Sequence, residues 1–156
     1  MPTLYFSKEH EDLVKALCTE SSQPGLEEIF PRYRELMLFA AMLGKKEGRQ
    51  AERTGIGGEV ESNYFKSPGF NKEGVIYLLG LLESRDPKVL KGGAPDCWKL
   101  FESYCNGGME IIAEWLSVAE SSEQYLEILQ TKLLEMARKS KKVSVRVKKP
   151  KLTKLS

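Results

Sequence analysis

In this 156-residue chain, the side chains best suited to bind a ligand are the cations of its C-terminal end. Residues 138–156 contain nine lysine or arginine residues and no acid, whereas residues 1–137 contain 15 basic and 22 acidic residues. The net charge of +2 therefore divides into −7 for the body and +9 for the terminus. Clustered cations bind phosphate oxygens and displace the counterions of nucleic acids. We therefore predict that the terminus is an arm that binds DNA, with duplex DNA as the expected target.

A second group of cations, between residues 45 and 53, extends the same predicted surface. Among the aromatic residues, Tyr64 and Phe65 lie in a predicted loop and are candidates for stacking on bases. A terminus that is only solvated and aids solubility is an open alternative, whereas few apolar anchors argue against a membrane. The predicted DNA-contacting residues are Lys45, Lys46, Arg49, Arg53, Arg138, Lys139, Lys141, Lys142, Arg146, Lys148, Lys149 and Lys151.

Other residue types that serve in catalysis lack the partners that they need. The single histidine, His10, stands among acids in a polar stretch, which predicts a solvated surface residue. The run Gly55–Gly58 lacks the lysine and hydroxyl residue that end a phosphate-binding P-loop, so it predicts a turn. Cys18, Cys97 and Cys105 have no paired spacing, which predicts buried thiols and neither a zinc site nor a disulfide framework. We therefore expect no catalytic residue, metal or cofactor.

An apolar run from Leu36 to Leu43 predicts the helix around which the other elements pack. A helix that is apolar on every side belongs in a core. Pro31 suits its first turn, and Gly44 suits the left-handed residue that ends a helix. Gly80 lies inside a later predicted helix, where glycine costs about 1 kcal/mol relative to alanine. That position therefore indicates close packing of a neighbouring element.

Apolar periodicity predicts the remaining elements. Asn106–Gly108 is expected to end one helix before another begins, because asparagine and glycine tolerate the left-handed conformation. Thr3–Phe6 predicts a short strand or an extended lead-in, and residues 59–61 predict a hairpin. Residues 142–147 alternate as a strand that pairs with Thr3–Phe6 or another edge. The predicted helices span roughly residues 7–19, 31–44, 71–84, 95–106, 109–119 and 123–138.

These patterns predict a mainly α fold, a single-domain orthogonal bundle of five or six helices around the buried central helix with one small β ribbon. The length suits one domain that buries roughly 70% of the surface of its unfolded form. The expected division is a helical domain over residues 1–137 and a basic tail over residues 138–156. The N-terminal residues lack the features of a signal peptide, and the cysteines suit a reducing compartment, so we expect a cytoplasmic protein.

Three segments together resemble a known family: Lys8–Val14 (KEHEDLV), Leu36–Gly44 (LMLFAAMLG) and Phe101–Gly108 (FESYCNGG). In this order and spacing they resemble DNA phosphorothioation (Dnd) system-associated protein 4, over roughly residues 5–135. Cys105 stands where the family usually has a small residue. Such proteins are encoded beside genes that install or police sulfur in the DNA backbone of bacteria and archaea. The basic tail lies outside the resemblance.

The resemblance implies a role in antiphage defence and restriction–modification, beside other Dnd-system proteins, and carries no catalytic residues. Together with the basic tail it predicts a non-enzymatic accessory or DNA-binding protein. One alternative is a protein–protein adaptor whose tail strand adds to a sheet edge through Val143, Val145 and Val147. A metal-dependent DNA nickase is a further alternative. It has less support, because the acids of the chain lack a strand pair that would bring them together to bind a metal ion.

Overall fold

The computed structural model describes the backbone of residues 2–18, 29–88, 90 and 95–155, and the side chains of this set up to Ser140 apart from Pro95. The chain divides into two compact units, Met1–Glu114 and Trp115–Ser156. The described part is mainly α-helical, with five α-helices and one two-stranded sheet, which confirms the predicted fold class. The end of the helix predicted over residues 7–19 lies outside the described residues.

The first unit contains two strands, three complete helices and most of a fourth. Short 3-10 turns, η1 (Lys8–His10) and η2 (Ser62–Phe65), follow the two strands. In chain order the main elements are β1 (Thr3–Phe6), α1 (Glu11–Leu17), α2 (Tyr33–Glu47), β2 (Gly58–Glu61), α3 (Glu73–Ser84) and α4 (Pro95–Leu116). The second unit contains the end of α4, the 3-10 turn η4 (Ser122–Gln124) and α5 (Tyr125–Leu155).

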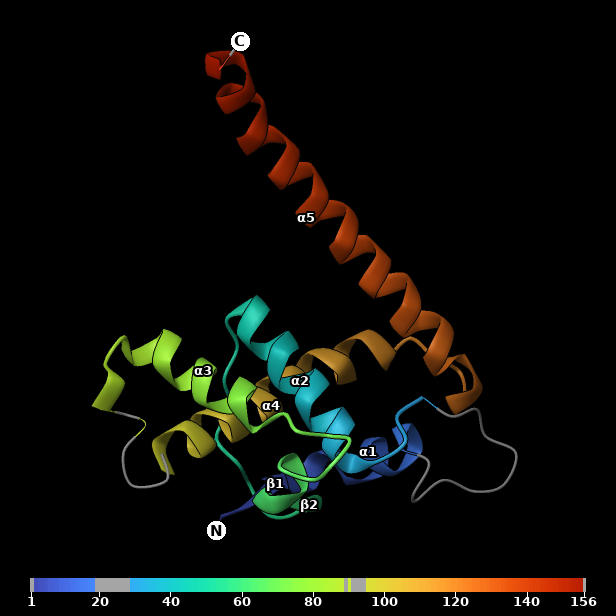
Figure 1. Cartoon of the computed structure of the whole chain (residues 1–156). Helices are drawn as coiled ribbons and strands as arrows, with labels where there is room; N and C mark the ends of the chain where they lie inside the picture. The colour runs from blue at the N-terminus through green and yellow to red at the C-terminus, as the bar shows by residue number, and fades with distance from the viewer. Residues whose placement is uncertain (1, 19–28, 89, 91–94, 156) are drawn as a thin grey trace. The chain divides into compact units, whose positions relative to one another are not determined.

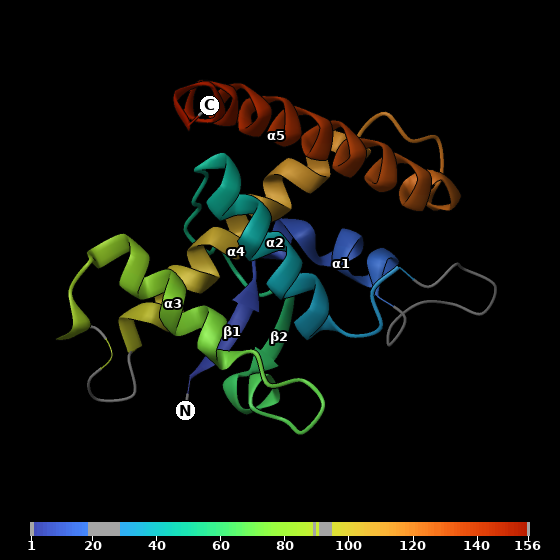
Figure 2. The same cartoon turned by 45° about the horizontal axis from the view of Figure 1, so that its top comes forward.

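Helices α2 and α4 cross with their backbones in contact (Figure 2). A Cβ atom added to Gly108 would lie 1.8 Å from the carbonyl oxygen of Ala40. A Cβ atom added to Gly44 would lie 2.2 Å from the carbonyl oxygen of Tyr104. Real Cβ atoms do not approach an oxygen so closely, so each helix needs glycine where it meets the other.

This crossing corrects two predictions. Gly44 does not end α2, which continues to Glu47 and ends at Gly48, a left-handed residue with φ of 69°. Asn106–Gly108 does not separate two helices, because α4 is one helix of 22 residues that runs through it. A helix end and a close helix crossing cannot be told apart from the local sequence, because both favour glycine.

The central helix lies in the core, as predicted, although one of its apolar residues does not. Met42 is 36% exposed, so one side of α2 reaches solvent. On α3, Gly80 confirms the expected close packing, because a Cβ atom there would lie 2.1 Å from Sγ of Cys97 on α4. The buried residues of α2 are Leu36, Met37, Ala40, Ala41, Leu43 and Gly44.

Strand β1 pairs with β2 in antiparallel register, so that Leu4 faces Val60 and Tyr5 faces Glu59. Leu4 and Val60 are buried on the core side of this ribbon. The strand at Thr3–Phe6 is confirmed, but the local hairpin at residues 59–61 is wrong, because β2 pairs with the N-terminus of the chain. The pairing is between distant segments and leaves no local sequence signal.

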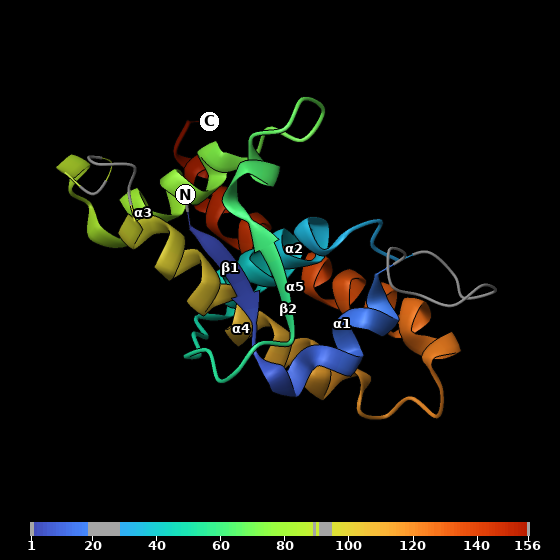
Figure 3. The same cartoon turned by 90° about the horizontal axis from the view of Figure 1, so that it is seen from below.

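The predicted strand at residues 142–147 is also wrong. Those residues belong to the backbone of α5, a continuous helix from Tyr125 to Leu155 that extends past the expected end near Arg138 (Figure 1). Lysine and arginine, which are frequent in this segment, favour helix. The far edge of β1, one partner we expected for that strand, lies beside α4 (Figure 3). The side chains of Glu102 and Asn106 accept hydrogen bonds from the amides of Tyr5 and Ser7 there.

We predict that Gly108→Ala lowers the free energy of unfolding by 3 kcal/mol or more, roughly the upper end of the cost of overpacking a core, because the obstacle is backbone rather than a movable side chain. Chemical denaturation monitored by circular dichroism measures the change. Gly74→Ala on α3 is the matched control, since a Cβ atom there meets nothing within 4 Å. That control should be neutral or stabilise by up to about 1 kcal/mol. Equal effects of the two substitutions would contradict the crossing.

Candidate nucleic-acid interface

The cations predicted to contact DNA between residues 45 and 53 are held by carboxylates of the body. Arg49 places Nη1 2.8 Å from Oε2 of Glu114. Arg53 places Nε 3.6 Å from Oε1 of Glu102 and stacks its guanidinium 4.5 Å from the centre of the Tyr5 ring. Such pairs neutralise the field that a polyanion would feel at this surface.

Lys45 forms an ion pair with Glu83 that spans α2 and α3. The hydroxyl of Tyr104 donates a hydrogen bond of 2.5 Å to Oε1 of the same glutamate. Hydrogen bonds from Lys45 and Tyr104 lower the pKa of Glu83, and the bond to Glu83 raises the pKa of Lys45. Both partners therefore stay charged around neutral pH. Lys46, beside them, is exposed.

The polar segment that carries these cations is attached along α4. The amide of Ala51 donates to the carbonyl of Ser103 at 3.0 Å, and the hydroxyl of Ser103 bonds Oε1 of Gln50 at 2.6 Å. Further along, Thr54 donates its amide to the hydroxyl of Ser7 and accepts from the amide of Lys8. Arg49 and Arg53 are therefore fixed by backbone contacts as well as by ion pairs.

The cations of the C-terminal segment stand in a different setting. Arg138 and Lys139 are exposed, and among the described residues neither contacts a carboxylate. The backbone of the whole segment is helical as far as Leu155. The side chains of the remaining predicted contacts, Lys141, Lys142, Arg146, Lys148, Lys149 and Lys151, lie outside the described residues.

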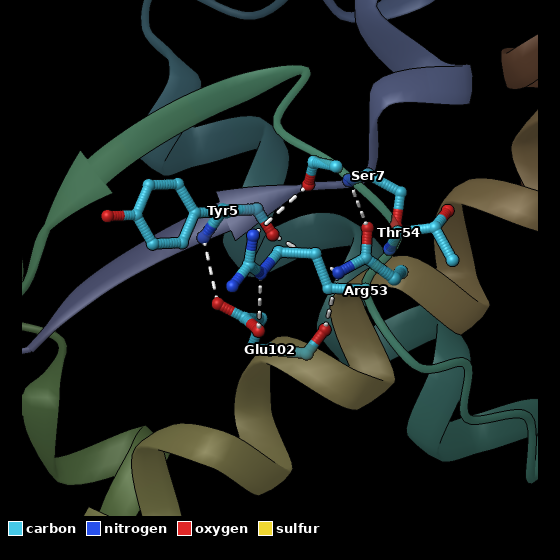
Figure 4. Close-up of polar contacts among 7 residues, drawn as sticks. Tyr5, Ser7, Arg53, Thr54 and Glu102 are labelled. Carbon is cyan, nitrogen blue, oxygen red and sulfur yellow. Dashed lines mark hydrogen bonds and ion pairs between the residues drawn. The ribbon is translucent and has the colours of Figure 1, made fainter.

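The buried side chain of Asn106 links α4 to the start of the chain. Its Oδ1 accepts from the amide of Ser7 at 2.8 Å, and its Nδ2 donates to the carbonyl of Tyr5 at 3.1 Å. One turn earlier on α4, Oε2 of Glu102 accepts from the amide of Tyr5 at 2.9 Å, and its other oxygen faces Arg53 (Figure 4). Two side chains of α4 therefore satisfy the outer edge of β1.

The predicted surface position of His10 is wrong. His10 is 4% exposed, and its Nε2 has no hydrogen-bond partner in the described part of the chain, although Oε1 of Glu9 lies 3.5 Å away. Burial lowers the pKa of His10 by more than the nearby Glu9 and Glu110 carboxylates raise it. Apolar neighbours on α1, among them Val14 and Leu17, draw this turn into the core.

The remaining candidates divide between core and surface. Cys18, Cys97 and Cys105 are buried, as predicted, and form no disulfide in the described part of the chain. Burial raises the pKa of the Cys97 and Cys105 thiols, so neither is primed as a nucleophile. Phe65 is fully buried against Phe101 and is unavailable to bases, whereas Tyr64 is 49% exposed. Within the described residues, no three His, Cys, Asp or Glu side chains are placed to hold a metal ion.

Sequence reasoning missed a pocket of about 280 Å³ beside β2. Neither the spacing nor the composition of its residues indicated it, because they come from three separate segments. The chain entering α2, the strand β2 and the turn η2 line it with Arg32, Tyr33, Arg34, Glu59, Val60, Glu61 and Tyr64.

Comparison with known proteins supplies the biological setting. The family described as DNA sulphur modification system-associated protein 4 matches residues 4–149, which is most of the chain, and confirms the resemblance seen in three sequence segments. The match extends into the basic tail, so the expectation that the tail lies outside the family resemblance is wrong. No curated protein and no solved structure matches the chain. Within the described residues, no helix has the length and apolar character needed to cross a bilayer.

We predict that Asn106→Ala destabilises the fold by about 2–4 kcal/mol, because it leaves the buried Ser7 amide and Tyr5 carbonyl unpaired. Urea unfolding followed by tryptophan fluorescence measures the loss. Lys99→Ala, an exposed position on the same helix, is the control and should change stability by less than about 0.5 kcal/mol. A loss for Asn106→Ala no larger than that of the control would show that its hydrogen bonds do not hold β1.

We predict that stability falls as the pH drops from 7.5 to 5.5. The pKa of His10 is lower in the folded than in the unfolded chain, so the unfolded chain binds more protons in this range. Proton binding therefore stabilises the unfolded chain relative to the folded one as the pH falls. The stabilisation is complete above the unfolded pKa of about 6.5 and is lost below it. Melting temperatures of wild type and His10→Gln across this range test the assignment. His10 is the single histidine, so the variant should show a flatter profile; parallel profiles would contradict it.

Proposed function

This chain belongs to the DNA sulphur modification system-associated protein 4 family, and we propose that it is a non-enzymatic accessory protein of a phosphorothioation-linked antiphage defence system that binds duplex DNA. Its partners are DNA and other proteins of that system, in the cytoplasm. The family match supports the association with DNA sulphur modification. The DNA contact is proposed from the charges of the chain.

The observation that carries the DNA proposal is the distribution of positive and negative charge along the chain. In the body, Lys45, Arg49 and Arg53 each face a glutamate, and 22 acids outnumber 15 cations over residues 1–137. Residues 138–156 hold nine cations and no acid. A duplex therefore meets repulsion over most of the body and attraction at the terminus. We propose residues 138–156 as the DNA-binding segment and residues 1–137 as its folded support.

The cations between residues 45 and 53 are the secondary part of the proposed surface. To bind a phosphate, Arg49 or Arg53 would have to leave its glutamate, which offsets most of the electrostatic gain. We therefore expect the terminal cations to contribute more to affinity than these four. The contributions of the two regions to DNA affinity can be compared directly, because four cations can be neutralised together in each region.

We predict that neutralising four terminal cations weakens duplex binding more than neutralising the four body cations does. Each phosphate contact contributes roughly 0.9 to the slope of log affinity against log salt, so losing four contacts reduces the slope by roughly three to four. Fluorescence anisotropy with a labelled duplex across a sodium chloride series measures both slopes. Glutamine keeps the helix propensity of the replaced residues. The matched full-length variants replace Arg138, Lys139, Lys141 and Lys142, or Lys45, Lys46, Arg49 and Arg53, with glutamine.

Equal loss in the two variants, or absence of binding by the wild type, would overturn the terminal arm. The non-enzymatic part of the proposal has its own test. Incubation of the protein with modified and unmodified supercoiled plasmid, in Mg²⁺ or Mn²⁺, should leave both plasmids intact. Conversion of either plasmid to the nicked form would establish an enzyme instead.

A further inference from the structure

The two edges of the β ribbon differ. The outer edge of β1 is closed, because Glu102 and Asn106 of α4 bind its backbone amides and carbonyl. The sheet has two strands in the described part of the chain, so no strand covers the other edge, that of β2. Figure 3 shows β1 between α4 and β2, with β2 as the outer strand. An uncovered strand edge is a template for another extended chain.

The register shows which groups β2 presents. The amide of Ser62 donates to the carbonyl of Pro2 at 3.0 Å, and Val60 lies opposite Leu4. Backbone groups alternate in direction along a strand, so the N–H and C=O groups of Glu59 and Glu61 point away from β1. The carbonyl of Glu61, the N-cap of η2, accepts the first hydrogen bond of that turn. The amides of Glu59 and Glu61 and the carbonyl of Glu59 form no hydrogen bond among the described residues. These three groups are a short row of unmet donors and one acceptor.

The pocket beside this edge provides space for a chain. Its volume of about 280 Å³ falls just below the usual range for small-molecule sites, and it is lined on one side by β2. On the other side, Arg34 is fixed by the Phe70 ring, 4.4 Å from its guanidinium carbon, and by a hydrogen bond of 3.3 Å to the carbonyl of Tyr64. A rigid wall facing an open edge suits an extended segment.

The charges of the pocket select the chemistry of that segment. Glu59 and Glu61 are exposed, and in the part of the chain that the structure describes neither has a cationic partner. Arg32, also exposed, has no carboxylate partner there. The unpaired charges therefore sum to one negative charge, which disfavours a phosphate backbone. Opposite charges on neighbouring strands stabilise a sheet, so lysine or arginine is favoured opposite the two glutamates.

We propose that the open edge of β2 is a docking site for an extended, basic segment of a partner protein, which adds to the ribbon as a third strand. The segment places lysine or arginine at alternate positions beside Glu59 and Glu61, and its backbone bonds the outward amides of both residues and the outward carbonyl of Glu59. Its intervening side chains face the pocket next to Val60. This site is separate from the proposed DNA-binding terminus and does not depend on it.

Glu61 offers a sharp test of strand addition. Its φ of −71° and ψ of 141° match proline, and its amide is not used in pairing with β1, so Glu61→Pro is compatible with the fold and removes one outward donor. Glu61→Gln is the matched control, because it removes the same charge and keeps the amide. Circular dichroism and melting temperature confirm that both full-length variants are folded.

The probe is a fluorescein-labelled seven-residue peptide of alternating lysine and valine, with an alternating glutamate and valine peptide as its counterpart. We predict that the wild type binds the lysine peptide in preference to the glutamate peptide by fluorescence anisotropy. Glu61→Gln should weaken binding modestly, and Glu61→Pro should weaken it about fivefold further, the value of one hydrogen bond near 1 kcal/mol. Equal affinities of the two variants, preference for the glutamate peptide, or no binding by the wild type would each overturn the proposal.

Discussion

The contact between the backbones of α2 and α4 is the constraint on which the rest of the first unit depends. Gly108 and Gly44 let the two helices touch where any side chain would collide with a carbonyl oxygen. Gly107 does the same for the segment after α2, since a Cβ atom there would lie 2.1 Å from the carbonyl oxygen of Arg49. Once α4 is pressed against α2, Asn106 and Glu102 lie beside β1.

That placement explains the charge distribution of the body. One carboxylate oxygen of Glu102 accepts a hydrogen bond from β1, and the other faces Arg53. Glu83 forms an ion pair with Lys45 and accepts a hydrogen bond from the Tyr104 hydroxyl. The same packing that closes the sheet edge therefore neutralises cations that would otherwise face solvent. The C-terminal segment differs, because its sequence contains nine cations and no acid.

The ribbon and the terminus present opposite charges to their surroundings. Glu59 and Glu61 make the open edge of β2 acidic, whereas residues 138–156 are wholly basic among their charged residues. A polyanion and a basic protein segment would therefore meet different parts of the chain. The proposed DNA contact and the proposed strand addition therefore use different residues of the chain.

The sequence by itself determined the helical class, the buried central run, the close packing at Gly80 and the segregation of charge, since these follow from composition and short-range periodicity. It did not reveal the pairing of β1 with β2, the burial of His10 or the continuity of α4 through Asn106–Gly108. Those features depend on contacts between residues far apart in the chain. Glycine permits both a helix end and a helix crossing, so only the position of α2 decided between them.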